Sequence, residues 1–148
     1  VVPHQVIDYT WGREQSFNFL LDGYVNHIDF THPYSPRLRE RLINSLTSAG
    51  LPFQHKGVYG CTQGPRLETA AEIQRLIRDG CDLVGMTAMP EAALARELDL
   101  EYAALCLVVN WAAGLAEQEL SIAEMMQILA SGMNNIKKTI FIFAKTTI

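Results

Sequence analysis

The sequence has 148 residues, of which 49% are hydrophobic and 19% charged, a composition typical of one globular domain with a buried core. The formal net charge is −4, and no cluster of lysines and arginines exists, so we expect neither nucleic acid nor a membrane surface as a partner. The three cysteines lack Cys-x-x-Cys spacing, which argues against a disulfide framework, a zinc site or any other metal site. Nothing resembles a signal peptide or a membrane span, so we expect a cytoplasmic protein without a cofactor.

The first fifty residues predict a strand, a long loop and a helix. Residues 1–9 have the apolar character of a strand, whereas residues 10–34 carry glycine, proline and many polar side chains and are expected to be irregular. Ser35 and Pro36 predict a helix start, and the helix is expected to end at Gly50. No linker or internal repeat is visible, so residues 1–148 are interpreted as part of a single domain.

A second strand and helix surround a short polar loop. Residues 57–61 predict a strand, and Thr69 with Glu72 three positions later forms a capping box that starts the next helix. Gly64-Pro65 interrupts regular structure just before this helix. The loop therefore presents Leu67 and Glu68 at a helix N-terminus, a position suited to ligand binding.

Two further strands are expected to follow, with a helix between them. Residues 81–86 predict a strand, residues 90–98 a helix with Pro90 in its first position, and the apolar run 102–109 a buried strand that ends at Asn110. Alternating strands and helices indicate an α/β fold with a parallel sheet. Because the carboxyl ends of parallel strands share one edge, the side chains that follow these strands should converge there. A last helix is expected to begin after Ser121, and the apolar residues 140–143 fit a buried helix or strand.

Each polar residue at this edge has a structural and a functional interpretation. Glu68 is either a first-turn acid favoured by the helix dipole or an acceptor that selects a ligand N–H. Asn110 either caps loose backbone groups or binds the edge of a heterocycle. Met86 and Thr87 form core and turn, or contact hydroxyl and anionic groups. His27 is the most plausible functional histidine, although a lone histidine is more often a surface residue.

Four sequence blocks carry a family resemblance: residues 64–72 (GPRLETAAE), 84–91 (VGMTAMPE), 94–97 (LARE) and 107–110 (LVVN). Together they resemble the trimeric purine nucleoside phosphorylase and methylthioadenosine phosphorylase family, and most strongly its bacterial branch that handles S-methyl-5'-thioinosine. The resemblance implies a three-layer α/β fold with a mixed, largely parallel sheet and helices on both faces. It also implies a homotrimer or hexamer, of which this sequence is the C-terminal part of each subunit.

The resemblance implies phosphorolysis, in which inorganic phosphate attacks C1' of a purine nucleoside and releases the base and a ribose 1-phosphate. Asn110 matches the family position that hydrogen-bonds N7 and the 6-substituent of the purine as the base departs. Glu68 matches the carboxylate that accepts the N1 hydrogen of a 6-oxopurine. Leu67 matches an aromatic position, so here an aliphatic side chain is expected to pack on the base.

Other matched positions belong to the sugar and the phosphate. Gly85 and Met86 match the ribose contact, Thr87 matches a phosphate contact, and His27 matches a residue that reaches a neighbouring subunit's 5' pocket. The adenine-using branch has acidic residues in place of Asn110 and Ala112. A 6-oxopurine satisfies a carboxylate and an amide that adenine would leave unpaired, a mismatch that hydrogen-bonding sites reject by roughly 10⁴.

The family's phosphate site also uses a glycine-rich loop and an Arg-His pair that this sequence does not contain. We therefore expect the sequence to be inactive by itself and to belong to a longer enzyme of purine salvage. Two alternatives remain open: a nucleoside hydrolase of the same superfamily, and a non-catalytic fragment that binds purines or forms trimers. Phosphate dependence of base release would separate the hydrolase from the phosphorylase.

Overall fold

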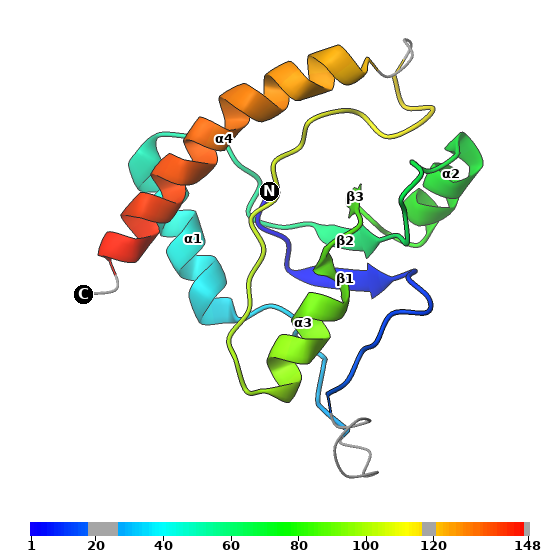
Figure 1. Ribbon diagram of the computed structural model, residues 1–148. Coiled ribbons are helices and arrows are strands. Elements are labelled where there is room, and N and C mark those ends of the chain that lie inside the picture. Colours follow the sequence, from blue (N-terminus) through cyan, green and yellow to red (C-terminus); the bar gives the residue numbers. More distant parts are fainter. Residues whose placement is uncertain (18–26, 117–120, 147–148) are drawn as a thin grey trace.

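The protein is described here by a computed structural model of residues 1–17, 27–116 and 121–146 (Figure 1). The described residues form a three-stranded parallel sheet in the order β1-β2-β3, with Val6 opposite Tyr59 and Gly60 opposite Val84. The strands are β1 (Gln5–Asp8), β2 (Val58–Cys61) and β3 (Leu83–Gly85). The predicted parallel α/β sheet is therefore confirmed.

Local capping residues set where the helices begin and end. The helices are α1 (Pro36–Ala49), α2 (Ala70–Arg78), α3 (Ala88–Glu97) and α4 (Ile122–Lys145). The Ser35 hydroxyl accepts the Leu38 N–H at 3.2 Å, and Gly50 ends α1 in the left-handed region at φ 67°. At the start of α2, Thr69 and Glu72 exchange both bonds of a capping box. The predicted ends of α1 and the predicted start of α2 are confirmed, whereas α3 spans Ala88–Glu97 in place of the predicted 90–98, with a non-helical Met89 just before Pro90.

Helices cover both faces of the sheet. Successive side chains of a strand point to opposite faces, so Gly60 lies on the face opposite Tyr59 and Cys61. Leu76 of α2 packs against Gly60, where there is no side chain to hold the helix away. On the other face Tyr59 and Cys61 form a buried cluster with apolar residues of α3. The central strand β2 is thus enclosed between α2 and α3.

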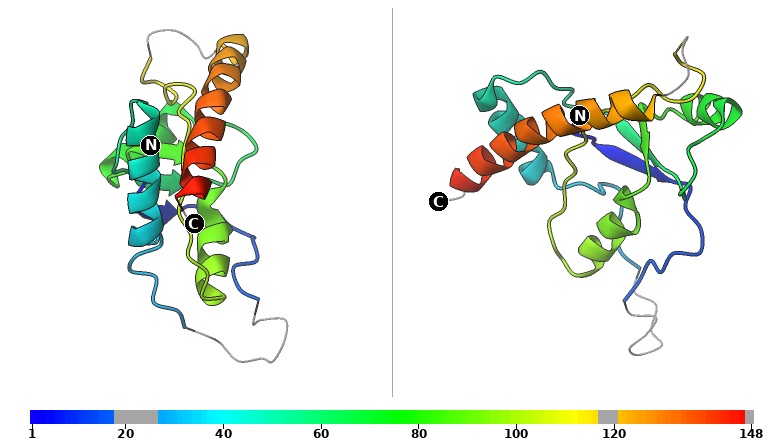
Figure 2. Two further views of the ribbon diagram at one scale, coloured as in Figure 1. Left: turned by 90° about the vertical axis from the view of Figure 1, so that its left-hand side faces the viewer. Right: turned by 45° about the horizontal axis from the view of Figure 1, so that its top comes forward.

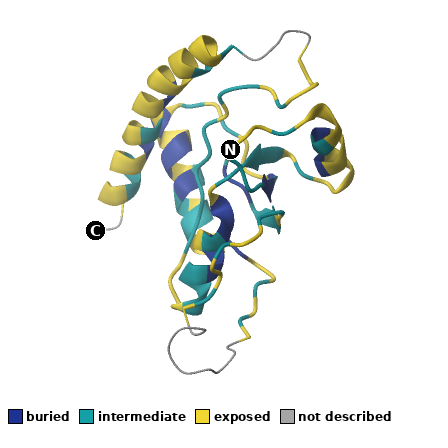
Figure 3. Cartoon of the chain, turned by 45° about the vertical axis from the view of Figure 1, so that its right-hand side comes forward, coloured by how far each residue is buried: buried dark blue, intermediate teal, exposed yellow. Residues whose placement is uncertain are grey.

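Helix α4 lies alongside α1 on the outer side of the molecule (Figures 1 and 2). Its inner face holds the buried Gly132 and Thr139, whereas most of its remaining surface is exposed (Figure 3). The Arg41 guanidinium of α1 lies 4.1 Å from the centre of the Phe143 ring, which joins the two helices near the end of α4. Residues 140–143 are therefore helical. The expectation that they are buried is wrong, because α4 turns only one side toward α1 and leaves Ile140 48% and Phe141 61% exposed. No helix in the described parts of the chain combines the length and apolarity needed to span a membrane.

The predicted strand at residues 102–109 is wrong. This segment is extended, but it is not a strand of the described sheet. Among the described residues, its hydrogen bonds to the start of the chain join one residue pair: the Cys106 N–H donates to the Val1 carbonyl oxygen at 2.9 Å, and the Val1 ammonium donates to the Cys106 carbonyl oxygen at 2.8 Å. A strand needs a ladder of successive pairs, and a single pair supplies none. The apolar character of the run reflects packing, with Leu107 pressed onto Gly132 of α4.

Candidate functional site

A cavity of about 1060 Å³ lies along β3 and the turn at its carboxyl end. Its lining comes from Val1, the loop before β2, the middle of β2, β3 with the turn after it, the start of α3, and the extended segment that leads to Asn110 and beyond it. The lining includes four residues singled out from the sequence, namely Gly85, Met86, Thr87 and Asn110. The extended segment thus brings Asn110 to the predicted sheet edge, although it does so without forming a strand.

Tyr59 is a cavity residue that the sequence analysis did not identify. A methyl group on Gly85 would lie 2.1 Å from the Tyr59 hydroxyl, so the glycine makes room for the tyrosine. The Thr87 N–H donates to the Tyr59 oxygen at 3.4 Å. Burial raises the pKa of Tyr59, which keeps the phenol protonated and able to donate a hydrogen bond. A buried strand tyrosine facing a glycine on the next strand is the signal that could have revealed it.

Asn110 and Thr87 each have side-chain polar groups that make no hydrogen bond to the neighbouring helix or turn. The Asn110 amide donates one N–H to the Trp111 carbonyl oxygen at 2.8 Å, which leaves the second N–H and the amide oxygen. Thr87 is the N-cap residue of α3, but its side chain makes no capping hydrogen bond. The cavity therefore has an amide and a hydroxyl available to a polar ligand.

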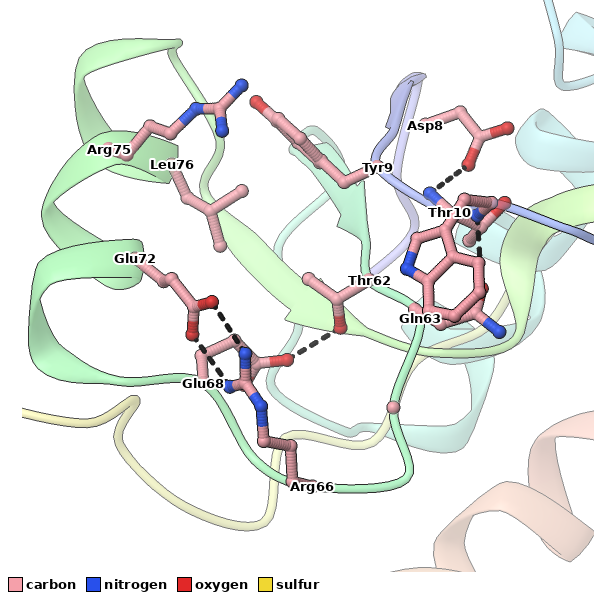
Figure 4. A pocket seen from close by; sticks show the side chains of 12 residues that line it. Asp8, Tyr9, Thr10, Thr62, Gln63, Arg66, Glu68, Glu72, Arg75 and Leu76 are labelled. Atoms are coloured by element: carbon pink, nitrogen blue, oxygen red, sulfur yellow. Dashed lines mark hydrogen bonds and ion pairs between the residues drawn. The ribbon is translucent and has the colours of Figure 1, made fainter.

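Glu68 lines a second cavity of about 480 Å³, between the loop after β1 and the start of α2 (Figure 4). Its Oε1 atom accepts a hydrogen bond from the Thr62 hydroxyl at 2.6 Å. Arg66 faces the same space and donates two hydrogen bonds of 2.8 Å to Glu72. These hydrogen bonds from Arg66, together with one from the Thr69 backbone, lower the pKa of Glu72 to about 2.

The two cavities adjoin, but neither contains both Glu68 and Asn110. Gly64 of the Glu68 loop lies directly against the Met86 side chain, since a methyl group there would be 2.5 Å from the Met86 sulfur. Gly114, just beyond Asn110, lies against Ala70 at the start of α2, where a methyl group on the glycine would be 2.8 Å from the Ala70 methyl carbon. The loops that carry Glu68 and Asn110 therefore meet, while their side chains occupy neighbouring spaces.

Two of the predicted site residues lie outside both cavities. Leu67 is 53% exposed on the loop beside Glu68. His27 is also exposed, on the described part of the long loop. The structure thus places Leu67 beside the site and leaves His27 apart from it. In the described parts of the chain, no three His, Cys, Asp or Glu side chains lie close enough together to hold a metal ion.

Arg13 is a second residue that the sequence analysis missed. Its guanidinium donates to the carbonyl oxygens of Gln63 and Met86, both at 2.9 Å, and to that of Met89. It donates also to Gln63 Oε1 at 3.2 Å and to the Thr62 carbonyl oxygen at 3.3 Å. One side chain from the loop after β1 thus joins the turns after β2 and β3. No sequence signal distinguished it, because its acceptors are mainly backbone atoms of distant residues.

Fold and site together define an α/β protein with polar side chains gathered where parallel strands end, the usual place for a small ligand in such sheets. Within that class, the chain belongs to the phosphorylase superfamily, which matches residues 1–145.

Named relatives agree with this assignment. The chain is 59% identical over 140 residues to a probable S-methyl-5'-thioinosine phosphorylase of Pseudomonas syringae pv. tomato, covering 94% of this chain and 56% of that protein. It is 42% identical over 148 residues to the 6-oxopurine nucleoside phosphorylase of Pyrococcus furiosus, covering 95% of this chain and 55% of that protein. The chain therefore spans little more than half the length of these relatives.

A solved structure supports the fold. Methylthioadenosine phosphorylase from Schistosoma mansoni, in complex with adenine, superposes with a TM-score of 0.89 over 99% of this chain and 58% of that one. The sequence identity is 23%, so the likeness shows the fold alone. The nucleoside phosphorylase-like fold expected from the sequence is confirmed.

Proposed function

We propose that this chain carries the purine-binding part of a phosphorylase for 6-oxopurine nucleosides, with S-methyl-5'-thioinosine as the favoured substrate and inosine and guanosine as further candidates. The observation that carries the proposal is the cavity along β3, whose lining includes Gly85, Met86, Thr87 and Asn110, with Glu68 on the adjoining loop. The relatives named above include phosphorylases for this nucleoside and for 6-oxopurine nucleosides. The proposed role is purine and methylthio-sugar salvage.

Donor and acceptor counting supports a 6-oxopurine as the base. Asn110 keeps one N–H, which can donate to O6, and its amide oxygen, which can accept from N7 when the departing base carries a hydrogen there. Glu68 is an acceptor only when ionised, so it suits the N1–H of hypoxanthine or guanine and opposes the unprotonated N1 of adenine. The exposed Leu67 would supply an apolar wall beside the base.

In the proposed reaction, a phosphate oxygen forms a bond to C1' while the bond from C1' to N9 of the purine breaks. The electron pair of that bond leaves with the base, and the sugar carries positive charge in the transition state. The Asn110 amide would hydrogen-bond the charge that develops on the base. Met86 would pack against the ribose next to Gly85, and the Thr87 hydroxyl would bind the phosphate, which is a co-substrate and not a cofactor.

We further propose a homo-oligomeric enzyme, a trimer or a hexamer, in which His27 contributes to the 5' pocket of a neighbouring subunit. Its exposure on the described part of the long loop is compatible with such a contact. Size-exclusion chromatography with light scattering would test the assembly. A monomeric active enzyme would contradict it.

The test of the function is an activity assay with a matched pair of nucleosides. A phosphorylase of full family length that carries this sequence should release hypoxanthine from S-methyl-5'-thioinosine, and only when phosphate is present. Methylthioadenosine is the control, because it differs at the 6-substituent and the N1 hydrogen. Faster cleavage of methylthioadenosine would overturn the assignment, and equal rates without phosphate would indicate a hydrolase.

A further inference from the structure

The Glu68 carboxylate is held by one identifiable neighbour, the Thr62 hydroxyl. The two oxygens are 2.6 Å apart, and the hydroxyl must be the donor because an ionised carboxylate has no proton to give. The same hydroxyl lies 3.3 Å from the Gly85 carbonyl oxygen, a longer contact. A hydroxyl has a single proton, so the shorter contact to Glu68 takes it.

Thr62 is itself fixed to the strand that borders the larger cavity. Its backbone N–H donates to the Gly85 carbonyl oxygen at 2.8 Å, directly after β2. Threonine is branched at Cβ, which restricts its χ1 angle and therefore the direction of its hydroxyl. Thr62 thus connects the Glu68 carboxylate to the end of β3, where Gly85 and Met86 line the cavity.

The hydrogen bond leaves one carboxylate oxygen for a ligand. In the described parts of the chain, Oε1 of Glu68 accepts a hydrogen bond from the Thr62 hydroxyl, and Oε2 accepts none. Arg66 lines the same cavity and could compete for a carboxylate there, but its guanidinium donates to Glu72. Figure 4 shows the two separate pairs, Thr62 with Glu68 and Arg66 with Glu72.

We propose that Thr62 is a positioning residue for purine selection: its hydroxyl holds Oε1 of Glu68 and so leaves Oε2 to accept the N1–H of a 6-oxopurine. This inference rests on the proposed function, in which Glu68 reads the N1 position. Without the hydroxyl, the three rotatable bonds of Glu68 allow the carboxylate to turn toward water or toward Arg66. Selection between hypoxanthine and adenine would then weaken, while the fold would remain.

The experiment measures the dissociation constants of hypoxanthine and adenine by isothermal titration calorimetry on the phosphorylase of full family length that carries this sequence. Thr62→Val removes the hydroxyl and preserves the branched shape, and Thr62→Ser restores the hydroxyl. One charge-assisted hydrogen bond corresponds to about a tenfold change. Thr62→Val should therefore lower the preference for hypoxanthine over adenine about tenfold, with adenine binding unchanged, and Thr62→Ser should keep the wild-type preference. Should valine prevent folding, which circular dichroism would reveal, Thr62→Ala gives the same comparison.

Glu68→Gln distinguishes the positioning role of Thr62 from the proposed role of Glu68 itself. If Glu68→Gln abolishes the preference while Thr62→Val keeps it, Thr62 has no positioning role and this inference is overturned alone. If the wild-type enzyme of full family length shows no preference for hypoxanthine, or Glu68→Gln leaves the preference unchanged, the proposed role of Glu68 fails and the inference fails with it. A loss in Thr62→Val that Thr62→Ser does not share supports both.

Discussion

Replacing Arg13 with methionine should destabilise the fold, because this one side chain joins three segments that are far apart in the sequence. Methionine has a similar length but no donor. The substitution would leave the carbonyl oxygens of Thr62, Gln63, Met86 and Met89 without their present partner. Carbonyl groups that are partly shielded from water cannot recover all of these hydrogen bonds from solvent.

The size of the effect follows from the quality of the contacts. The Arg13 bonds to Met86 and Gln63 are 2.9 Å long, whereas those to the Gln63 side chain and Thr62 reach 3.2 and 3.3 Å. A hydrogen bond from a charged donor contributes about 1.5–3 kcal/mol, and bonds from one half-buried group do not add fully. We therefore expect a loss of about 3 kcal/mol, which for a chain of this size lowers Tm by about 6–12 °C.

Thermal denaturation followed by circular dichroism measures this change. The matched control is Arg37→Met, which removes an exposed arginine whose guanidinium pairs with Glu101 on the surface. Exposed ion pairs contribute little, so the control should change Tm far less than Arg13→Met. Equal values of Tm for Arg13→Met and the wild-type chain would show that the three segments hold together without Arg13.

Three other predictions concern the site and its surroundings. Asn110→Ala should weaken hypoxanthine binding about tenfold without lowering Tm, measured by calorimetry and circular dichroism, because the amide is used for the ligand and one local bond. Gly85→Ala should cost about 1–3 kcal/mol in urea unfolding, since the new methyl group meets the Tyr59 hydroxyl. Adding Tyr59→Phe should recover part of that loss, and no recovery would refute the contact. The pKa of Glu72 lies near 2 in the folded chain, against an ordinary value of 4.5, chiefly because Arg66 donates to it. Its contribution to stability is therefore complete above pH 4.5 and disappears as the pH falls toward 2, and Glu72→Gln should flatten Tm across that interval.

Local sequence signals predicted most of the helices and strands because their causes are local. Ser35, Thr69 and Ser121 each accept a backbone N–H three residues on, as their spacing indicated. Gly50 ends its helix because it adopts a positive φ without a steric penalty. These features depend on residues within one turn of each other, so a sequence pattern contains them fully.

For the segment 102–109, the local sequence pattern did not predict the structure. A run of apolar residues indicates burial but does not specify which partner buries it. Here the partners are Val1, which pairs with Cys106, and Gly132 of α4, which receives Leu107. The same ambiguity explains why the apolar residues 140–143 fitted helix and strand equally well, and why they suggested a burial that Ile140 and Phe141 do not have.

The same distinction between local and long-range causes applies to the site. The sequence by itself determined the family blocks, the residue types that suit a 6-oxopurine, and the order of strands and helices that brings their ends to one edge. Only the tertiary structure decided that Glu68 and Asn110 line adjoining cavities, that Thr62 holds Glu68, and that Arg13 joins the turns after β2 and β3. These contacts join residues that the sequence separates, and their geometry depends on how the whole chain packs. No local pattern specifies such distances, whereas residue type and spacing are properties of the sequence itself.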